Sequence, residues 1–157
     1  MRMQAVVHWL TATPLSQAIQ TTSWAIPGIQ VIHIVSLATL FALALNLSLR
    51  VAGRGLTLEP LASLARRFVP AIWTCLAMLF LSGSLLILAE PFRTITNPVF
   101  YLKMSLLVIA IALTVWLASI ARRPAGKRAA IHVAAAILSM VVWVGIIIAG
   151  RYIAYFA

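Results

Sequence analysis

The sequence has 157 residues, of which 64% are hydrophobic and only 9% are charged. Soluble globular domains carry roughly 25% charged residues, so this chain could not cover a soluble surface and is predicted to be an integral membrane protein. Twelve Lys and Arg residues against two acids give a net charge of +10. Because the basic residues stand mostly beside the ends of apolar runs, this charge indicates orientation in a membrane rather than nucleic-acid binding.

The first 24 residues are predicted to form an interfacial segment. Residues 3–22 indicate one or two amphipathic helices, with a break where Thr13 would cap a helix that begins at Pro14. Trp9 and Trp24 suit the level of the lipid headgroups. The segment has no continuous apolar core of the length that a secretory signal peptide needs. We therefore expect residues 1–24 to lie in the interface and residues 25–157 to form the membrane domain.

Four apolar runs fill the remainder of the chain, at about 27–50, 70–89, 99–120 and 130–150. Each is close to the roughly 20 residues that span a bilayer as a helix. Backbone polar groups in lipid must pair within the chain, which favours helices, and short connections make successive helices antiparallel neighbours. The predicted fold is an all-α membrane protein: an up-down bundle of four transmembrane helices with an N-terminal interfacial amphipathic helix.

The connection between the first two runs predicts a short helix at the membrane surface. Thr57 is a suitable N-cap, and Glu59 and Pro60 would follow in the first turn. The apolar side of this helix would face the membrane surface and consist of Leu61, Leu64 and Phe68. A new helix is then expected to begin at Pro70.

The positions of the basic residues predict the orientation of the bundle. Eight of them lie in or beside the connections after the first and third runs: Arg50, Arg54, Arg66, Arg67, Arg122, Arg123, Lys127 and Arg128. The other four lie toward the opposite side: Arg2, Arg93, Lys103 and Arg151. The positive-inside rule places the group of eight in the cytoplasm. Both termini and the interfacial segment are then expected on the periplasmic side of a bacterial inner membrane.

Lys103 is the most informative single residue, because it stands about one turn inside the third apolar run. A charge within a membrane helix is costly unless it has a partner or a task. Its side chain could reach outward to the headgroups, pair with Glu90, or help to form a ligand site. The neighbouring residues on the outer side form a predicted partner or ion-pair cluster of Glu90, Arg93, Asn97, Tyr101 and Tyr152.

The histidines leave several interpretations open. His33 lies in the outer half of the first run and His132 at the cytoplasmic start of the fourth, about 20 Å apart in depth, so they could not share a heme. His33 could be a neutral residue that is hydrogen-bonded between helices. It could also bind heme b together with His8, or bind a quinone. The candidate cofactor-binding residues are therefore His33, Lys103, Arg151 and His8.

Signals for metal binding or catalysis are weaker. Met1, Met3 and His8 could approach copper on the outer side, but their spacing completes no coordination set, so we predict no metal ligand. The sequence contains no paired carboxylates, P-loop or dinucleotide fingerprint, so we expect no enzymatic activity. The leading expectation is a non-catalytic subunit or accessory protein that binds another membrane or periplasmic protein. The alternatives are a redox-type protein with heme b or quinone, and copper handling or metal-ion transport.

Two segments carry a resemblance to known proteins. One is the C-terminal stretch from Trp143 to Tyr155, which includes Ala-Gly-Arg-Tyr-Ile-Ala, and the other is the stretch from Asn97 to Met104. With Pro27 placed before Ile32-His33, they resemble an uncharacterised family of small bacterial four-helix inner-membrane proteins. The lysine at the start of the third helix also resembles, more weakly, the membrane domain of copper-resistance D proteins. The first resemblance implies the four-helix fold, and the second implies copper handling.

Overall fold

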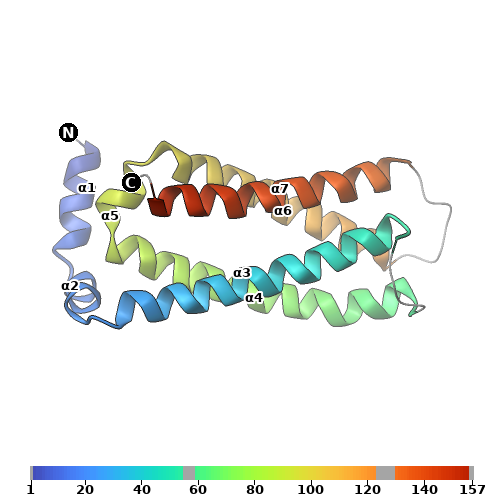
Figure 1. Cartoon of the computed structure of the whole chain (residues 1–157), viewed down its shortest axis with the longest axis horizontal. Helices are drawn as coiled ribbons and strands as arrows, with labels where there is room; N and C mark the ends of the chain where they lie inside the picture. The colour runs from blue at the N-terminus through green and yellow to red at the C-terminus, as the bar shows by residue number, and fades with distance from the viewer. Residues whose placement is uncertain (1, 55–58, 123–129, 156–157) are drawn as a thin grey trace.

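The computed structural model describes residues 2–54, 59–122 and 130–155, and its regular elements in these ranges are helices (Figure 1). In chain order they are α1 (Arg2–Thr11), α2 (Pro14–Thr21), α3 (Ala25–Val51), α4 (Leu61–Ala89), α5 (Pro91–Ile95), α6 (Pro98–Ala121) and α7 (Ala130–Tyr155). Within the described part of the chain, α3, α4, α6 and α7 are the four helices long and apolar enough to cross a membrane. The predicted all-α, four-helix membrane bundle is therefore confirmed.

The bundle has two distinct ends (Figure 1). Both chain termini lie at one end together with α1, α2 and α5, and we call it the terminal end. At the opposite end, the loop end, α3 and α6 finish and α4 and α7 begin. Helix α3 packs mainly against α4, and α6 packs mainly against α7. Contacts from α3 to both α6 and α7 join the two pairs into one bundle.

The hydrophobic core fills the middle and the loop end of the bundle. One cluster around Leu47, Ala65 and Leu117 lies toward the loop end, and a second around Leu40 and Trp143 lies in the middle. Among the described residues of α3 and α6, no side chain before Leu40 or Ala110 is buried. Near the terminal end, the buried residues of the long helices therefore come from α4 and α7, among them Ser82 and Ala149.

The second membrane helix is longer than predicted. Helix α4 begins at Leu61 and continues through Pro70, so the expected separate surface helix is wrong. Leu64 is buried, and Leu61 and Phe68 pack against the two core clusters rather than against the membrane surface. A proline is tolerated inside a membrane helix because neighbouring helices and local backbone adjustments compensate for the lost backbone hydrogen bond. Packing of this side of α4 against the core is consistent with a helix that continues through Pro70, while the expected cap Thr57 lies outside the described residues.

The N-terminal segment is fastened to the bundle by hydrogen bonds. Thr13 caps α2 by accepting a bond from the backbone N–H of Ser16, and Pro14 begins the helix, as predicted. The Ser16 hydroxyl then donates to the carbonyl oxygen of Leu88 at 2.7 Å, and Gln20 Nε2 donates to that of Ala89 at 2.9 Å. The last carbonyls of a helix lack intrahelical partners, so α2 completes the end of α4.

Candidate functional site

His33 is positioned by the helix beside it. It projects from α3 toward α4, where its Nδ1 lies 2.9 Å from the hydroxyl oxygen of Ser82. The next residue, Gly83, leaves room for the ring, because a Cβ atom there would lie 3.4 Å from His33 Cε1. The interpretation of His33 as a residue that is hydrogen-bonded between helices therefore accounts for Nδ1 but not for Nε2.

The hydrogen bonds of Ser82 indicate which nitrogen of His33 carries the proton. The Ser82 hydroxyl donates to the carbonyl oxygen of Met78 at 2.6 Å, so its oxygen is left to accept. The bond to His33 then requires an N–H at Nδ1. Nε2 consequently carries a lone pair, and no described residue donates a hydrogen bond to it. His33 thus presents an unused acceptor inside the bundle.

Lys103 projects from α6 across α7. A Cβ atom at Gly150 would lie 3.7 Å from Lys103 Nζ, so the absence of a side chain at Gly150 makes room for the ammonium group. The lysine is partly buried. Among the described residues, none accepts a hydrogen bond from Nζ. Lys103 therefore presents a donor that the described residues leave unused.

These residues form what we call the four-helix polar site: His33 from α3, Ser82 from α4, Lys103 from α6 and Gly150 from α7. At 1.5 Å per residue, each lies about 8–12 Å from the terminal end of its own helix. This is the level at which α3 and α6 bury no side chain. A donor and an acceptor therefore lie at one level of the bundle, where neither α3 nor α6 buries a side chain.

The predicted pairing of Lys103 with Glu90 does not form. Glu90 instead accepts a 2.9 Å bond from Arg93 on α5, one turn further along the chain. Arg93 also reaches the carbonyl oxygen of Ile153 near the end of α7, with a separation of 3.5 Å. The ion pair therefore links α5 to α7 at the terminal end, and Lys103 is left to the interior of the bundle.

In its described part, the structure shows no contact of the other predicted cofactor-binding residues with His33 or Lys103. Arg151 is exposed, where its guanidinium bonds the Tyr155 hydroxyl at 2.9 Å and lies over that ring. His8 is exposed on α1, so the structure does not bring it to His33 as the heme hypothesis required. Tyr152 is also exposed.

Two members of the predicted outer cluster have structural roles. Asn97 caps α6 by accepting a 2.9 Å bond from the N–H of Val99. The Tyr101 hydroxyl donates to the carbonyl oxygen of Ile95 at 3.0 Å, which holds α5 against α6. Both residues shape the connection between α4 and α6 rather than the four-helix polar site.

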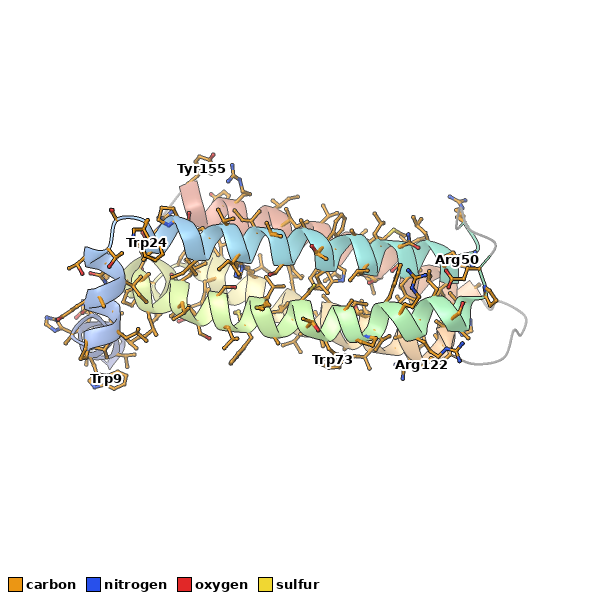
Figure 2. The ribbon with its side chains drawn as sticks, turned by 90° about the horizontal axis from the view of Figure 1, so that it is seen from below. Trp9, Trp24, Arg50, Trp73, Arg122 and Tyr155 are labelled. Atoms are coloured by element: carbon orange, nitrogen blue, oxygen red, sulfur yellow. The ribbon has the colours of Figure 1, made fainter. Side chains whose placement is uncertain are left out.

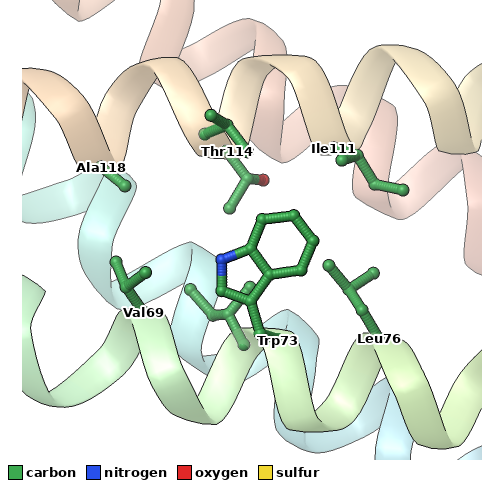
Figure 3. Close-up of a pocket in the computed structure, with 8 residues that line it drawn as sticks. Val69, Trp73, Leu76, Ile111, Thr114 and Ala118 are labelled. Atoms are coloured by element: carbon green, nitrogen blue, oxygen red, sulfur yellow. The ribbon is translucent and has the colours of Figure 1, made fainter.

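Two surface hollows lie outside the polar site. A small apolar one, of about 20 Å³, lies between α4 and α6, where Trp73 faces Thr114 and Ala118 (Figure 3). A wider cleft of about 470 Å³ lies at the terminal end between α2 and the Glu90–Arg93 pair. Within the described ranges, no group of three His, Cys, Asp or Glu side chains is arranged to hold a metal ion.

Sequence reasoning identified His33 and Lys103 but missed their neighbours. Ser82 and Gly83 are small residues within an apolar run, and Gly150 belongs to the C-terminal motif. Their spacing gave no sign that they would meet a histidine and a lysine. Comparison with known proteins yields no match among family models, curated proteins or solved structures.

Proposed function

We propose that this chain is a non-catalytic membrane subunit or accessory protein that holds a lipid-soluble ligand at the four-helix polar site. The observation that supports this is that His33 and Lys103, from different helices, lie at one level of the bundle with an unused acceptor and an unused donor. A partner membrane or periplasmic protein would then use, deliver or receive the ligand.

The energetics of the bilayer support a task for Lys103. A charged side chain costs roughly 2.5–3.5 kcal/mol at the centre of a membrane helix and less toward its ends, and charged residues that face the inside of a bundle commonly mark functional sites. Lys103 could lower this cost by reaching the headgroups, but its ammonium lies against Gly150 on the neighbouring helix. A bound polar group would supply the missing acceptor.

The proposed location is a bacterial inner membrane with both termini in the periplasm. Described basic residues at the loop end include Arg50, Arg66 and Arg122, which the positive-inside rule assigns to the cytoplasm. Figure 2 shows Arg50 and Arg122 at this end, opposite Trp9, Trp24 and Tyr155. The four-helix polar site would then lie in the periplasmic half of the bilayer.

The redox alternative gains specific support from the free Nε2 of His33. Heme b is the less favoured cofactor, because the proposed second ligand His8 is exposed on α1 and away from the site. A quinone needs hydrogen-bonding partners but no second imidazole. Copper handling has less support, because no cluster of His, Cys, Asp or Glu occurs in the described residues, and the side chains of Met1 and Met3 lie outside them.

The proposal is tested by replacing Lys103 with methionine, which has similar length and no charge. We expect Lys103→Met to insert and fold as wild type but to lose the bound ligand. Native mass spectrometry of protein purified from its own membranes in mild detergent would measure the ligand. Arg151→Met is the matched control, since Arg151 is an exposed cation on α7 near the same end and should leave the ligand bound.

Two results would contradict the proposed function. One is wild-type protein that is consistently purified without any bound small molecule. The other is a ligand that Lys103→Met and wild type retain equally, because the ligand would then not depend on the polar site.

A further inference from the structure

We infer that the cleft at the terminal end is a second site, which binds the headgroup of a phospholipid that carries both a phosphate and a primary ammonium group. Phosphatidylethanolamine has this chemistry. The cleft has a volume of about 470 Å³ and is lined by residues of all five helices from α1 to α5. It shares no lining residue with the four-helix polar site, so this inference goes beyond the proposed function.

The walls of this cleft are fixed by contacts within the chain. Helix α2 forms one wall, where Gln20 Nε2 donates to the carbonyl oxygen of Ala89 at 2.9 Å. On the other side, Arg93 donates to Glu90 at 2.9 Å and reaches the carbonyl oxygen of Ile153 on α7 at 3.5 Å. Helix α1 also packs against α5. The cleft is therefore already shaped, and its volume falls in the range of about 300–1,000 Å³ that is typical of ligand pockets.

The charges that line the cleft match a zwitterion. Glu90 and Arg93 carry opposite charges, and their side chains are 38% and 34% exposed, so a ligand in the cleft can reach both. A ligand with a single charge would be attracted by one of them and repelled by the other. A zwitterion can place its phosphate beside Arg93 and its cation beside Glu90. Arginine is well suited to the phosphate, because its guanidinium matches phosphate oxygens in geometry and charge.

The acceptors in the cleft favour a cation that can donate hydrogen bonds. Among the described residues, none donates to Glu90 Oε1, because the bond from Arg93 goes to Oε2. Gln20 uses its Nε2 as a donor, and no described residue donates to its Oε1. Thr11 gives its proton to the backbone, so its hydroxyl oxygen can still accept. A primary ammonium has three N–H donors for these oxygens, whereas the trimethylammonium group of a choline lipid has none.

The place of the cleft favours a lipid over a soluble zwitterion. Helices α1 and α2 lie beyond the ends of the long membrane helices, at the level where a bilayer holds its headgroups (Figure 1). Phe92, which is 66% exposed, and the partly buried Ile26 add apolar surface to the lining. A phospholipid would present its headgroup to the charged pair and its glycerol and acyl chains to this apolar surface.

The experiment uses the full-length protein, freed of lipid in mild detergent and followed by native mass spectrometry. It is titrated with dioctanoyl phosphatidylethanolamine and, in parallel, with the dioctanoyl forms of phosphatidylcholine and phosphatidylglycerol. The choline lipid keeps the positive charge but lacks N–H donors, and the glycerol lipid lacks the cation. We expect phosphatidylethanolamine to bind about three- to tenfold more tightly than either, as one additional hydrogen bond predicts.

Glu90→Gln tests the contact with the ammonium group. This variant keeps the size of the side chain and removes its charge, so the preference for phosphatidylethanolamine over phosphatidylcholine should disappear. Phosphatidylglycerol should bind at least as tightly as to wild type, because Arg93 remains, whereas a general loss of folding would weaken all three lipids. Glu59→Gln is the matched control. It alters the acid at the loop end, which pairs with Arg67 at 3.7 Å, and should keep the wild-type preference.

Four results would overturn the inference. Two are equal affinities of wild type for the ethanolamine and choline lipids, and a preference that Glu90→Gln retains in full. A third is competition by glycerophosphoethanolamine, which lacks acyl chains, at concentrations equal to those of the lipid, because the ligand would then be a soluble zwitterion. The fourth is loss of the preference in Lys103→Met. Lys103 does not line the cleft, so this variant should bind phosphatidylethanolamine as wild type does, which distinguishes the cleft from the four-helix polar site.

Discussion

Among the described residues, Trp143 is the largest side chain that the bundle buries completely, and its polar atom is paired. Indole Nε1 donates to the hydroxyl of Thr114 at 3.3 Å, which links α7 to α6 in the middle of the core. We predict that Trp143→Phe lowers the free energy of unfolding by about 1–2 kcal/mol, through loss of this bond and of part of the ring. Denaturant titration in detergent micelles, followed by near-ultraviolet circular dichroism, would measure the change.

The matched control is Trp116→Phe, which alters a partly exposed tryptophan on α6 and should change stability by less than about 0.5 kcal/mol.

Thr114→Val removes the hydroxyl that accepts the hydrogen bond from Trp143. Its effect and that of Trp143→Phe should be clearly less than additive in the double variant, because both remove one bond. Fully additive effects would show that the hydrogen bond contributes nothing to stability.

At the scale of single residues, the sequence reveals rare side chains but not their neighbours. Lys103 and His33 are conspicuous because polar groups are scarce in apolar helices. Which way they point depends on the rotation of α3 and α6 about their axes. Both helices are apolar on nearly all sides, so no polar stripe indicates that rotation. The contacts with Ser82 and Gly150 therefore required the structure.

At the scale of elements, α2 was expected to lie in the membrane interface. In the structure it is also hydrogen-bonded to the end of α4. We predict that Ser16→Ala together with Gln20→Ala releases α2, because two carbonyls of α4 lose their donors. Each lost bond is worth about 1 kcal/mol. Hydrogen–deuterium exchange should become faster in residues 14–21 and at the end of α4.

Gln17→Ala is the control for this experiment. Gln17 lies on the same helix with an exposed side chain, so its replacement should leave exchange in α4 unchanged. If the double variant and the control exchange alike, the two hydrogen bonds do not hold α2 in place.

The membrane helices could be predicted because length and hydropathy define them. Their first and last residues were harder to predict. Pro70 reads as a helix start in the sequence, since proline is favoured in a first turn. In the structure it lies inside α4, where burial of Leu64 and its neighbours on one side maintains the helix. Local propensity was overruled by packing, which the sequence does not display directly.

At the scale of the whole molecule, the two ends differ in charge and in packing. The loop end carries the described residues Arg50, Arg66, Arg67 and Arg122 and a tightly packed cluster, and the terminal end carries the attached N-terminal helices. We predict that alkaline phosphatase fused after the C-terminus is active, because this enzyme folds only in the periplasm. A fusion within residues 52–60, between α3 and α4, should be inactive, and reversed activities would contradict the proposed orientation.

The attachment of α2 also has a consequence for biosynthesis. The donors in Ser16 and Gln20 precede their acceptors, at Leu88 and Ala89, by 72 and 69 positions along the chain. Until the ribosome has added the intervening residues, Ser16 and Gln20 have no carbonyl acceptors on α4. The two hydrogen bonds that attach α2 can therefore form only after the whole of α4 has been synthesised.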